Sequence, residues 1–133
     1  MSEENVEAFK RIIDAANRGD VEAMLAELDP EFEYHAVLPL LGGEAEYRGD
    51  EGMRAFLREV WDALDDTHFD FPEIFDAGDR LLAIGHFRAR GKVSGVATET
   101  PFAFVGEFKD GKAVRLQGFL DRAEALEAAG LSE

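Results

Sequence analysis

Four residues carry side chains that could polarise a substrate oxygen or move a proton, namely Tyr34, His35, Glu107 and Asp121. A tyrosine hydroxyl can hold an oxygen on which charge develops, and histidine is the commonest general base near neutral pH. A carboxyl group in apolar surroundings keeps its proton more firmly than one in water, so a buried Glu107 could shuttle a proton. These residue types are typical of proton transfer that needs no cofactor, and we expect the protein to use no cofactor.

Three of these residues also have a purely structural interpretation. A strand histidine usually lies at a surface or an interface, and His35 would face the interior only if the strand register shifted by one residue. Glu107 lies three residues before a predicted turn, where water is near. Asp121 begins a capping-box sequence, and an N-cap aspartate contributes about 1 kcal/mol to helix stability. The sequence leaves open which of the three faces a cavity, and whether the protein is an enzyme.

The composition disfavours several classes of function. The 133 residues include 29 acids and 14 bases, for a formal net charge of -15, which disfavours nucleic acid and anionic membrane surfaces as partners. There is no cysteine, so disulfides and thiolate sites are excluded. The three histidines lack the spacing of metal ligands, so we expect no metal site. No signal peptide or membrane span is visible, which predicts a soluble cytoplasmic protein.

Apolar residues at helical spacing occupy the first half of the chain. They predict helices over residues 3–18, from Asp20 to just before Pro30, and from a cap at Asp50 to Leu64, with a strand from about residue 31 between the last two. After Asp66 the period changes to two, which predicts strands near residue 68 and over residues 80–92, 100–109 and 112–120. A short helix follows Asp121. This order indicates one α+β domain over residues 1–133, with helices on one face of a curved sheet.

Several stretches resemble the SnoaL-like family of the nuclear transport factor 2-like superfamily, namely NRGDVEAMLAELDPEFEYHAV, YRGDEGMRAFL and FKDGKAVRLQGFLDRAEALEAAGL. The resemblance covers nearly the whole chain. It implies a cone in which a curved, mixed but mostly antiparallel sheet wraps over three N-terminal helices around an internal pocket. Members are often dimers. They include ketosteroid isomerases, polyketide cyclases, limonene epoxide hydrolases, dehydratases and non-enzymatic binders, so the fold does not decide the function.

The predicted turn at Asp110-Gly111 assigns side chains to the two faces of the sheet. A two-residue turn places Lys109 opposite Lys112, and directly opposed residues share a face. On this count one face carries several aromatic residues whose exposure would be unusual in a monomer. We therefore expect a homodimer through the outer sheet face, with an interface formed by Phe102, Phe104, Arg115, Gln117 and Phe119.

The resemblance also indicates which side chains face the interior of the cone. It turns Tyr34 inward and His35 outward, and together with the strand period it implies a ligand pocket. The expected lining is Phe32, Tyr34, Ala36, Leu38, Leu41, Phe56, Trp61, Phe87, Val105, Leu116, Gly118 and Leu120. Small residues among these would leave space for a hydrophobic small molecule. The apolar segment VLPLLGG, residues 37–43, is expected to form a movable lip over the pocket mouth.

The catalytic residues that the resemblance would supply are mostly missing. Of the water-activating set of the epoxide hydrolases only Tyr34 is kept, since the other positions fall on Ala36, Phe87, Ala89 and Gly118. The isomerase base falls on Ala36, or on His35 if the alignment shifts by one residue. Three functions remain. The protein could be a pocket enzyme for isomerisation, cyclisation or dehydration of a hydrophobic metabolite, a non-catalytic binder of an apolar small molecule, or an assembly domain that uses only its outer sheet face.

Overall fold

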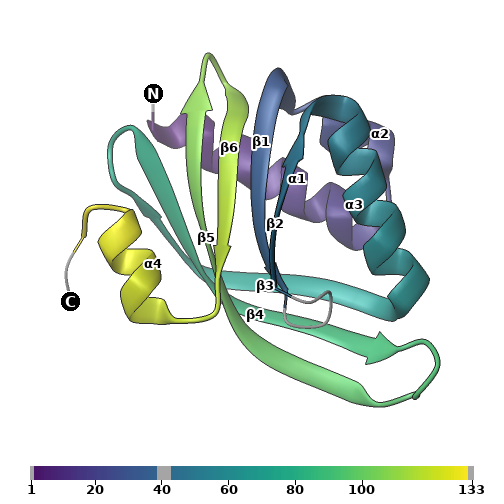
Figure 1. Ribbon diagram of the computed structural model, residues 1–133. Helices are drawn as coiled ribbons and strands as arrows, with labels where there is room; N and C mark the ends of the chain where they lie inside the picture. The colour runs from purple at the N-terminus through teal and green to yellow at the C-terminus, as the bar shows by residue number, and fades with distance from the viewer. Residues whose placement is uncertain (1, 39–42, 132–133) are drawn as a thin grey trace.

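The computed structural model describes residues 2–38 and 43–131 (Figure 1). In chain order the elements are α1 (Ser2–Arg18), α2 (Val21–Leu25), β1 (Leu28–Leu38), β2 (Gly43–Arg48), α3 (Gly49–Ala63), β3 (Leu64–Asp76), β4 (Arg80–Gly91), β5 (Ala97–Lys109), β6 (Lys112–Phe119) and α4 (Arg122–Ala128). The strands form one sheet in the order β2-β1-β6-β5-β4-β3, in which β1 and β6 are parallel and the other neighbours antiparallel. The predicted α+β fold with a curved mixed sheet is confirmed.

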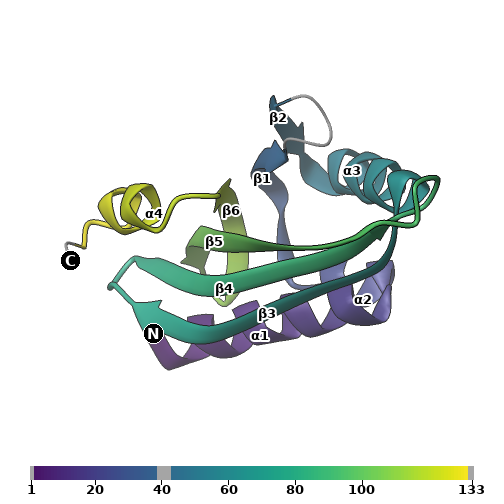
Figure 2. The same ribbon diagram turned by 90° about the horizontal axis from the view of Figure 1, so that it is seen from below.

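The sheet separates two apolar clusters. Helices α1 and α3 lie on its concave side and α4 on the opposite side (Figure 2). The apolar stripe of α1, with Phe9 and Ile12, is buried in the main core together with Phe56 and Leu57 of α3. Helix α4 covers a smaller cluster on the outer face, formed by Leu82, Ala103, Val105, Ala125, Leu126 and Ala129. None of the helices in the described ranges has the length and apolar character needed to cross a membrane.

The starts of the helices follow local signals, with one exception. Asp20 caps α2, because its Oδ1 accepts a hydrogen bond from the Ala23 N–H at 3.1 Å. The predicted cap of α3 at Asp50 is wrong, since Arg48 occupies the N-cap position without a side-chain bond and Asp50 lies inside the first turn. Gly49 between them has a φ of +65°, which allows the chain to pass directly from β2 into the helix.

Strand β2 was not predicted. It pairs antiparallel with β1, from Glu33 opposite Arg48 to Leu38 opposite Gly43. The signal was present, because Glu44, Glu46 and Arg48 alternate with smaller or apolar residues in GEAEYR. The ends of the expected lip are therefore paired strand, while residues 39–42, including Leu41, lie outside the described part of the chain.

The β5–β6 hairpin contains a bulge that the sequence did not reveal. The two-residue turn is as predicted, with φ of +52° at Asp110 and +76° at Gly111, and Lys109 lies opposite Lys112. Phe108 then pairs with Ala113 but Glu107 with Arg115, so Val114 is an extra residue on β6. Because side chains alternate along a strand, one extra residue exchanges the faces of β5 relative to β6.

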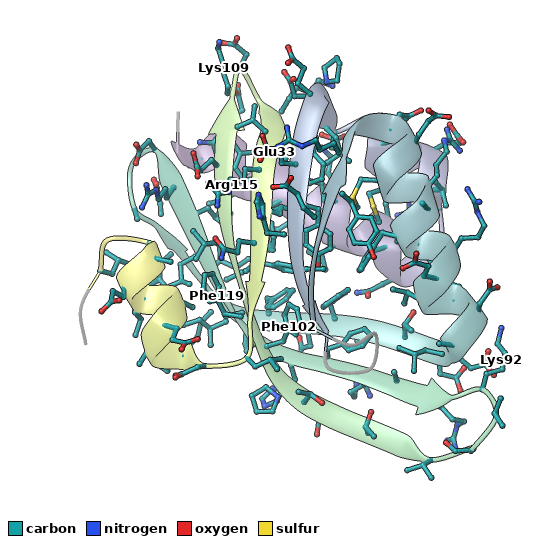
Figure 3. The ribbon with its side chains drawn as sticks, viewed as in Figure 1. Glu33, Lys92, Phe102, Lys109, Arg115 and Phe119 are labelled. Atoms are coloured by element: carbon teal, nitrogen blue, oxygen red, sulfur yellow. The ribbon has the colours of Figure 1, made fainter. Side chains whose placement is uncertain are left out.

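This exchange overturns part of the predicted interface. Phe102 and Phe104 are only 3% and 4% exposed and belong to the main core of the monomer, so they cannot form a contact between subunits. The ring of Phe104 lies with its centroid 5.0–6.2 Å from those of Phe9, Tyr34, Phe69, Phe71 and Phe102. Arg115, Gln117 and Phe119 are on the outer face, as expected, and Figure 3 shows Arg115 beside Glu33 and Phe119 near α4.

Candidate functional site

A largely enclosed apolar cavity of about 40 Å³ lies between α1, α3 and the concave face of the sheet. Its walls are formed by Ala16, Asn17, Tyr34, Phe56, Leu57, Val60, Trp61, Thr67, Phe69 and Phe87. The polar residues among them are Asn17, Tyr34 and Thr67, and no carboxylate or imidazole of the described residues lines the cavity. The volume suits a functional group rather than a metabolite, since small-molecule sites usually enclose about 300–1,000 Å³.

Tyr34 is the most deeply buried polar side chain at this cavity. It projects inward from β1, like Phe32 and Ala36, and its residue is 3% exposed. Its ring packs edge-on against Phe56, with centroids 4.7 Å apart. Burial raises the pKa of the Tyr34 phenol, and the nearby Tyr47 adds a smaller effect in the same direction. The raised pKa keeps the phenol neutral near pH 7, and within the described residues no hydrogen bond engages its hydroxyl.

Asn17 joins α1 to the edge strand β3. Its Nδ2 donates a hydrogen bond to the Phe69 carbonyl at 2.9 Å, and its Oδ1 accepts one from the Phe69 N–H at 2.8 Å. The side-chain amide thus takes the place of the neighbouring strand that β3 lacks. Asn17 and Phe69 are both part of the cavity wall, so this pair fixes one side of the cavity.

Aromatic rings occupy the space that the sequence analysis expected to be empty. A Cβ added to Gly118 would lie 2.9 Å from Phe102 Cζ, so this glycine makes room for a ring of the monomer's own core. A Cβ on Gly85 would lie 1.8 Å from the Asp70 carbonyl oxygen, so this glycine permits close backbone approach. Because Phe102 and Phe104 point inward, the cavity is much smaller than the predicted pocket.

The predicted pocket residues fall into three groups in the structure. Tyr34, Phe56, Trp61 and Phe87 line the cavity. Phe32, Ala36, Leu116 and Gly118 are buried on the concave side but do not line it. Val105 lies in the outer cluster beneath α4, and Leu120 is 38% exposed, so the prediction was wrong for these two. The side chain of Leu38, like Leu41, lies outside what the structure describes.

The candidate acids and bases lie away from the cavity. His35 faces outward, and its Nε2 lies 3.2 Å from Glu33 Oε1 and 3.4 Å from Glu46 Oε2. Glu107 is also on the outer face, contrary to the suggestion that it could reach inside, because of the bulge. It lies 3.8 Å from Arg115. Asp121 caps α4, with its Oδ1 accepting a hydrogen bond from the Ala123 N–H at 2.9 Å.

The outer-face group of Glu33, His35 and Glu46 has the residue types of a metal site. Their ligand atoms all lie within 4.8 Å of one another. Arg48 already forms ion pairs with both carboxylates, at 3.3 Å from Glu33 and 3.1 Å from Glu46. The His35 hydrogen bond is the largest cause of the lowered pKa of the Glu33 carboxyl, and Arg48 contributes further. The group is therefore satisfied as an ion-pair network.

Six residues of the cavity wall are absent from the predicted lining, namely Ala16, Asn17, Leu57, Val60, Thr67 and Phe69. Asn17 follows the apolar stripe of the first helix, where a polar side chain beside Ala16 could have suggested a specific partner. Phe69 belongs to the HFDF stretch, in which polar and apolar residues alternate. Its place among the apolar residues indicates a side chain that faces the interior. Thr67 carried no distinguishing signal.

An α+β fold with a curved six-stranded sheet is shared with solved structures of nuclear transport factor 2-like proteins. The family model of the SnoaL-like domain matches residues 9–116, and the chain belongs to the SnoaL-like family. No curated protein matches the chain in sequence.

Solved structures share the fold at low sequence identity. An NTF2-like protein of unknown function from Burkholderia pseudomallei is 24% identical, with a TM-score of 0.79 over 93% of this chain and 95% of its own. TerC, co-crystallised with polyporic acid, is 23% identical, with a TM-score of 0.79 over 96% and 98%. A ketosteroid isomerase-like protein from Catenulispora acidiphila, in complex with trimethylamine, is 15% identical, with a TM-score of 0.76 over 94% and 93%.

Proposed function

We propose that this protein binds a small apolar molecule carrying an oxygen function and does not transform it. The observation that carries the proposal is Tyr34, a buried residue of the cavity wall whose hydroxyl has no hydrogen-bond partner among the described residues. A hydroxyl without a partner in apolar surroundings costs up to about 1–3 kcal/mol, and a ligand oxygen that reached it would recover part of that free energy. Apolar walls with one oriented polar group are typical of small-molecule sites.

Proton-transfer catalysis is the alternative, and the placement of the titratable groups disfavours it. A general base must come within about 3 Å of the proton that it removes, directly or through one water. His35, Glu107 and Asp121 are engaged on the outer face or at the start of α4, and none of them lines the cavity. Two proteins of the same fold were crystallised with small organic molecules, which supports ligand binding in this fold.

The test replaces each of the two tyrosines by phenylalanine and measures the binding of two ligands that differ only in a hydroxyl group. Tyr34→Phe should raise the free energy of unfolding by about 1 kcal/mol, because it removes an unpaired buried hydroxyl. The same change should weaken binding of 1-naphthol about tenfold, and it should leave binding of naphthalene unchanged. Urea unfolding and titration calorimetry measure these two effects. Native mass spectrometry of the purified protein would identify any ligand that remains bound.

Tyr47→Phe is the control, because the Tyr47 hydroxyl is outside the cavity wall and donates a hydrogen bond to Glu59 at 2.8 Å. It should not change affinity for either ligand. Equal 1-naphthol affinity in the wild-type protein and Tyr34→Phe would contradict the proposed role of Tyr34. Turnover of a bound substrate that is lost on replacing His35, Glu107 or Asp121 would instead support the catalytic alternative.

We further propose that the protein forms a homodimer through the outer face of β1, β2 and β6. Helix α4 covers the apolar part of the outer face over β4, β5 and β6, so the uncovered part is mainly charged. Glu33 and Arg115 lie side by side there, in register on β1 and β6 (Figure 3). A two-fold axis through such a face could place the acidic groups of one subunit against the basic groups of the other.

A further inference from the structure

The cavity at Tyr34 shares a wall with a second, open space. A groove of about 310 Å³ runs between α1 and β3 and is lined by Phe9, Lys10, Ile13, Asp14, Asn17, His68, Phe69, Asp70, Phe71 and Ile74. Asn17 and Phe69 line both the groove and the cavity. The two spaces are therefore neighbours, and the paired Asn17 and Phe69 stand between them.

The connection between these two residues consists of the two hydrogen bonds of 2.8 Å and 2.9 Å that join the Asn17 amide to the Phe69 backbone. In residues 2–38 and 43–131 they are the only hydrogen bonds seen between α1 and β3. Strand β3 is an edge of the sheet, so no further strand holds Phe69 in place on that side. Movement of β3 away from α1 at this point would break these two hydrogen bonds and the apolar contacts between the two elements, such as that of Phe9 with Phe71.

We propose that the Asn17–Phe69 pair is a latch, and that the ligand site is the continuous space formed by the cavity and the groove when this latch opens. The inference rests on the proposed binding function and specifies where the ligand lies. The closed cavity of about 40 Å³ is too small for a metabolite, whereas the groove and cavity together reach the lower end of the usual 300–1,000 Å³.

The chemistry of the combined space defines a ligand class. The inner end is lined by Tyr34 among other aromatic residues, so its hydroxyl is the nearest phenolic group to a ligand placed there. Phe9, Ile13, Phe71 and Ile74 supply apolar walls along the groove. Lys10, Asp14, His68 and Asp70 line it with both signs of charge. The site therefore fits an elongated apolar molecule with an oxygen function at the inner end, and with an outer end that reaches water among charged side chains of both signs.

The latch makes an unusual prediction about affinity. If the ligand binds only the open form, its apparent affinity equals its affinity for the open form multiplied by the fraction of protein that is open. Asn17→Ala removes both hydrogen bonds and so shifts the free protein toward the open form. The net contribution of two hydrogen bonds to stability corresponds to a change of about tenfold or more in the equilibrium constant between the closed and open forms. Asn17→Ala should therefore bind an apolar probe about tenfold more tightly and with a faster association rate, although its folded state is less stable.

The probe is the neutral fluorophore N-phenyl-1-naphthylamine. Trp61, the single tryptophan of the chain, lines the cavity and acts as the energy donor. Asn5→Ala is the matched control, since Asn5 is the other asparagine of α1 and lines neither space. It should bind the probe like the wild-type protein. A purely structural role for Asn17 would give weaker or unchanged binding in Asn17→Ala, and that result would overturn the latch.

A second measurement needs only the wild-type protein, in case Asn17→Ala does not fold. The Phe69 amide donates to Asn17 Oδ1 when the latch is closed. Its hydrogen exchange, followed by NMR, should become faster when the probe binds, whereas a ligand confined to the closed cavity would slow it. Slower exchange would overturn the latch. If neither the wild-type protein nor Asn17→Ala binds the probe, the proposed binding function itself fails; if both bind it equally, only the latch fails.

Discussion

The pKa values of the Tyr34 and Tyr47 phenols are raised in the folded protein, so the stability of the fold depends on pH. The pKa of both phenols is raised from the usual value, at Tyr34 by burial and at Tyr47 by burial and then by the hydrogen bond to Glu59. Tyr34 is the more strongly affected, because its side chain is in the core and has no hydrogen-bond partner among the described residues. A neutral Tyr34 can donate to a ligand oxygen throughout the physiological pH range.

The free energy of unfolding should fall as the pH rises above about 10. Above that value the unfolded chain releases its phenolic protons while the folded protein still retains them, so the unfolded state binds fewer protons. The expected slope is at most about 1.4 kcal/mol per pH unit for each tyrosine. Tyr34→Phe should remove more of this slope than Tyr47→Phe in urea unfolding between about pH 9 and 11. Equal slopes in both variants would contradict the burial of Tyr34.

The inward orientation of Tyr34 and the outward orientation of His35 could be predicted from the sequence, because strand parity and the family resemblance agree there. The partner of Asn17 could not be predicted, because it is a backbone group 52 residues away along the chain. Helix-period patterns do not encode which distant strand a side-chain amide will reach. The size of the cavity was also beyond the sequence, since it depends on which strand face carries Phe102 and Phe104.

At the scale of elements, the bulge in the β5–β6 hairpin decides which residues hold the core together. Parity counted from the Asp110-Gly111 turn gives the correct face for Leu116 and Gly118 on β6, and the wrong face for Phe104 and Val105 on β5. A single extra residue, Val114, causes the whole difference. The existence of the helices was predicted correctly, although α2 ends at Leu25 and not just before Pro30, where β1 has already begun. A strand pattern, in contrast, gives no sign of an inserted residue.

Replacing Phe104 tests this exchange of faces. Phe104→Ala should lower the free energy of unfolding by about 3–5 kcal/mol, because it leaves a cavity among five aromatic rings. Val105→Ala should cost less, since Val105 lies in the smaller cluster beneath α4 and loses fewer atoms. Denaturant titrations of both variants measure the difference. A smaller loss for Phe104→Ala than for Val105→Ala would place Phe104 on the outer face after all.

At the scale of the whole molecule, the net charge of -15 makes association between copies depend on a few basic groups. On the outer face, Arg115 lies 3.8 Å from Glu107 and is in register with Glu33. Arg48 bridges Glu33 and Glu46 nearby. These contacts leave a mixed-charge surface in place of the aromatic interface expected from the sequence.

Arg115→Glu should convert the proposed dimer to monomers in sedimentation velocity, because it removes a cation from the interface and adds a like charge. Arg58→Glu is the control with the same change of net charge, since Arg58 is exposed on α3 and has no ion-pair partner within the described residues. It should leave the dimer intact. A wild-type monomer, or an unchanged dimer in Arg115→Glu, would contradict the proposed interface.

The parallel pairing of β1 with β6 has a consequence for how the chain is made. Residues 28–35 pair with residues 113–117, which lie far along the chain. During synthesis, β1 can therefore be enclosed by strands on both sides only after residues 113–117 have left the ribosome. Until then β1, with Phe32 and Tyr34, presents an unpaired strand edge to other chains. Long-range closure of this kind slows folding, so the nascent protein depends on a late step to protect its own core.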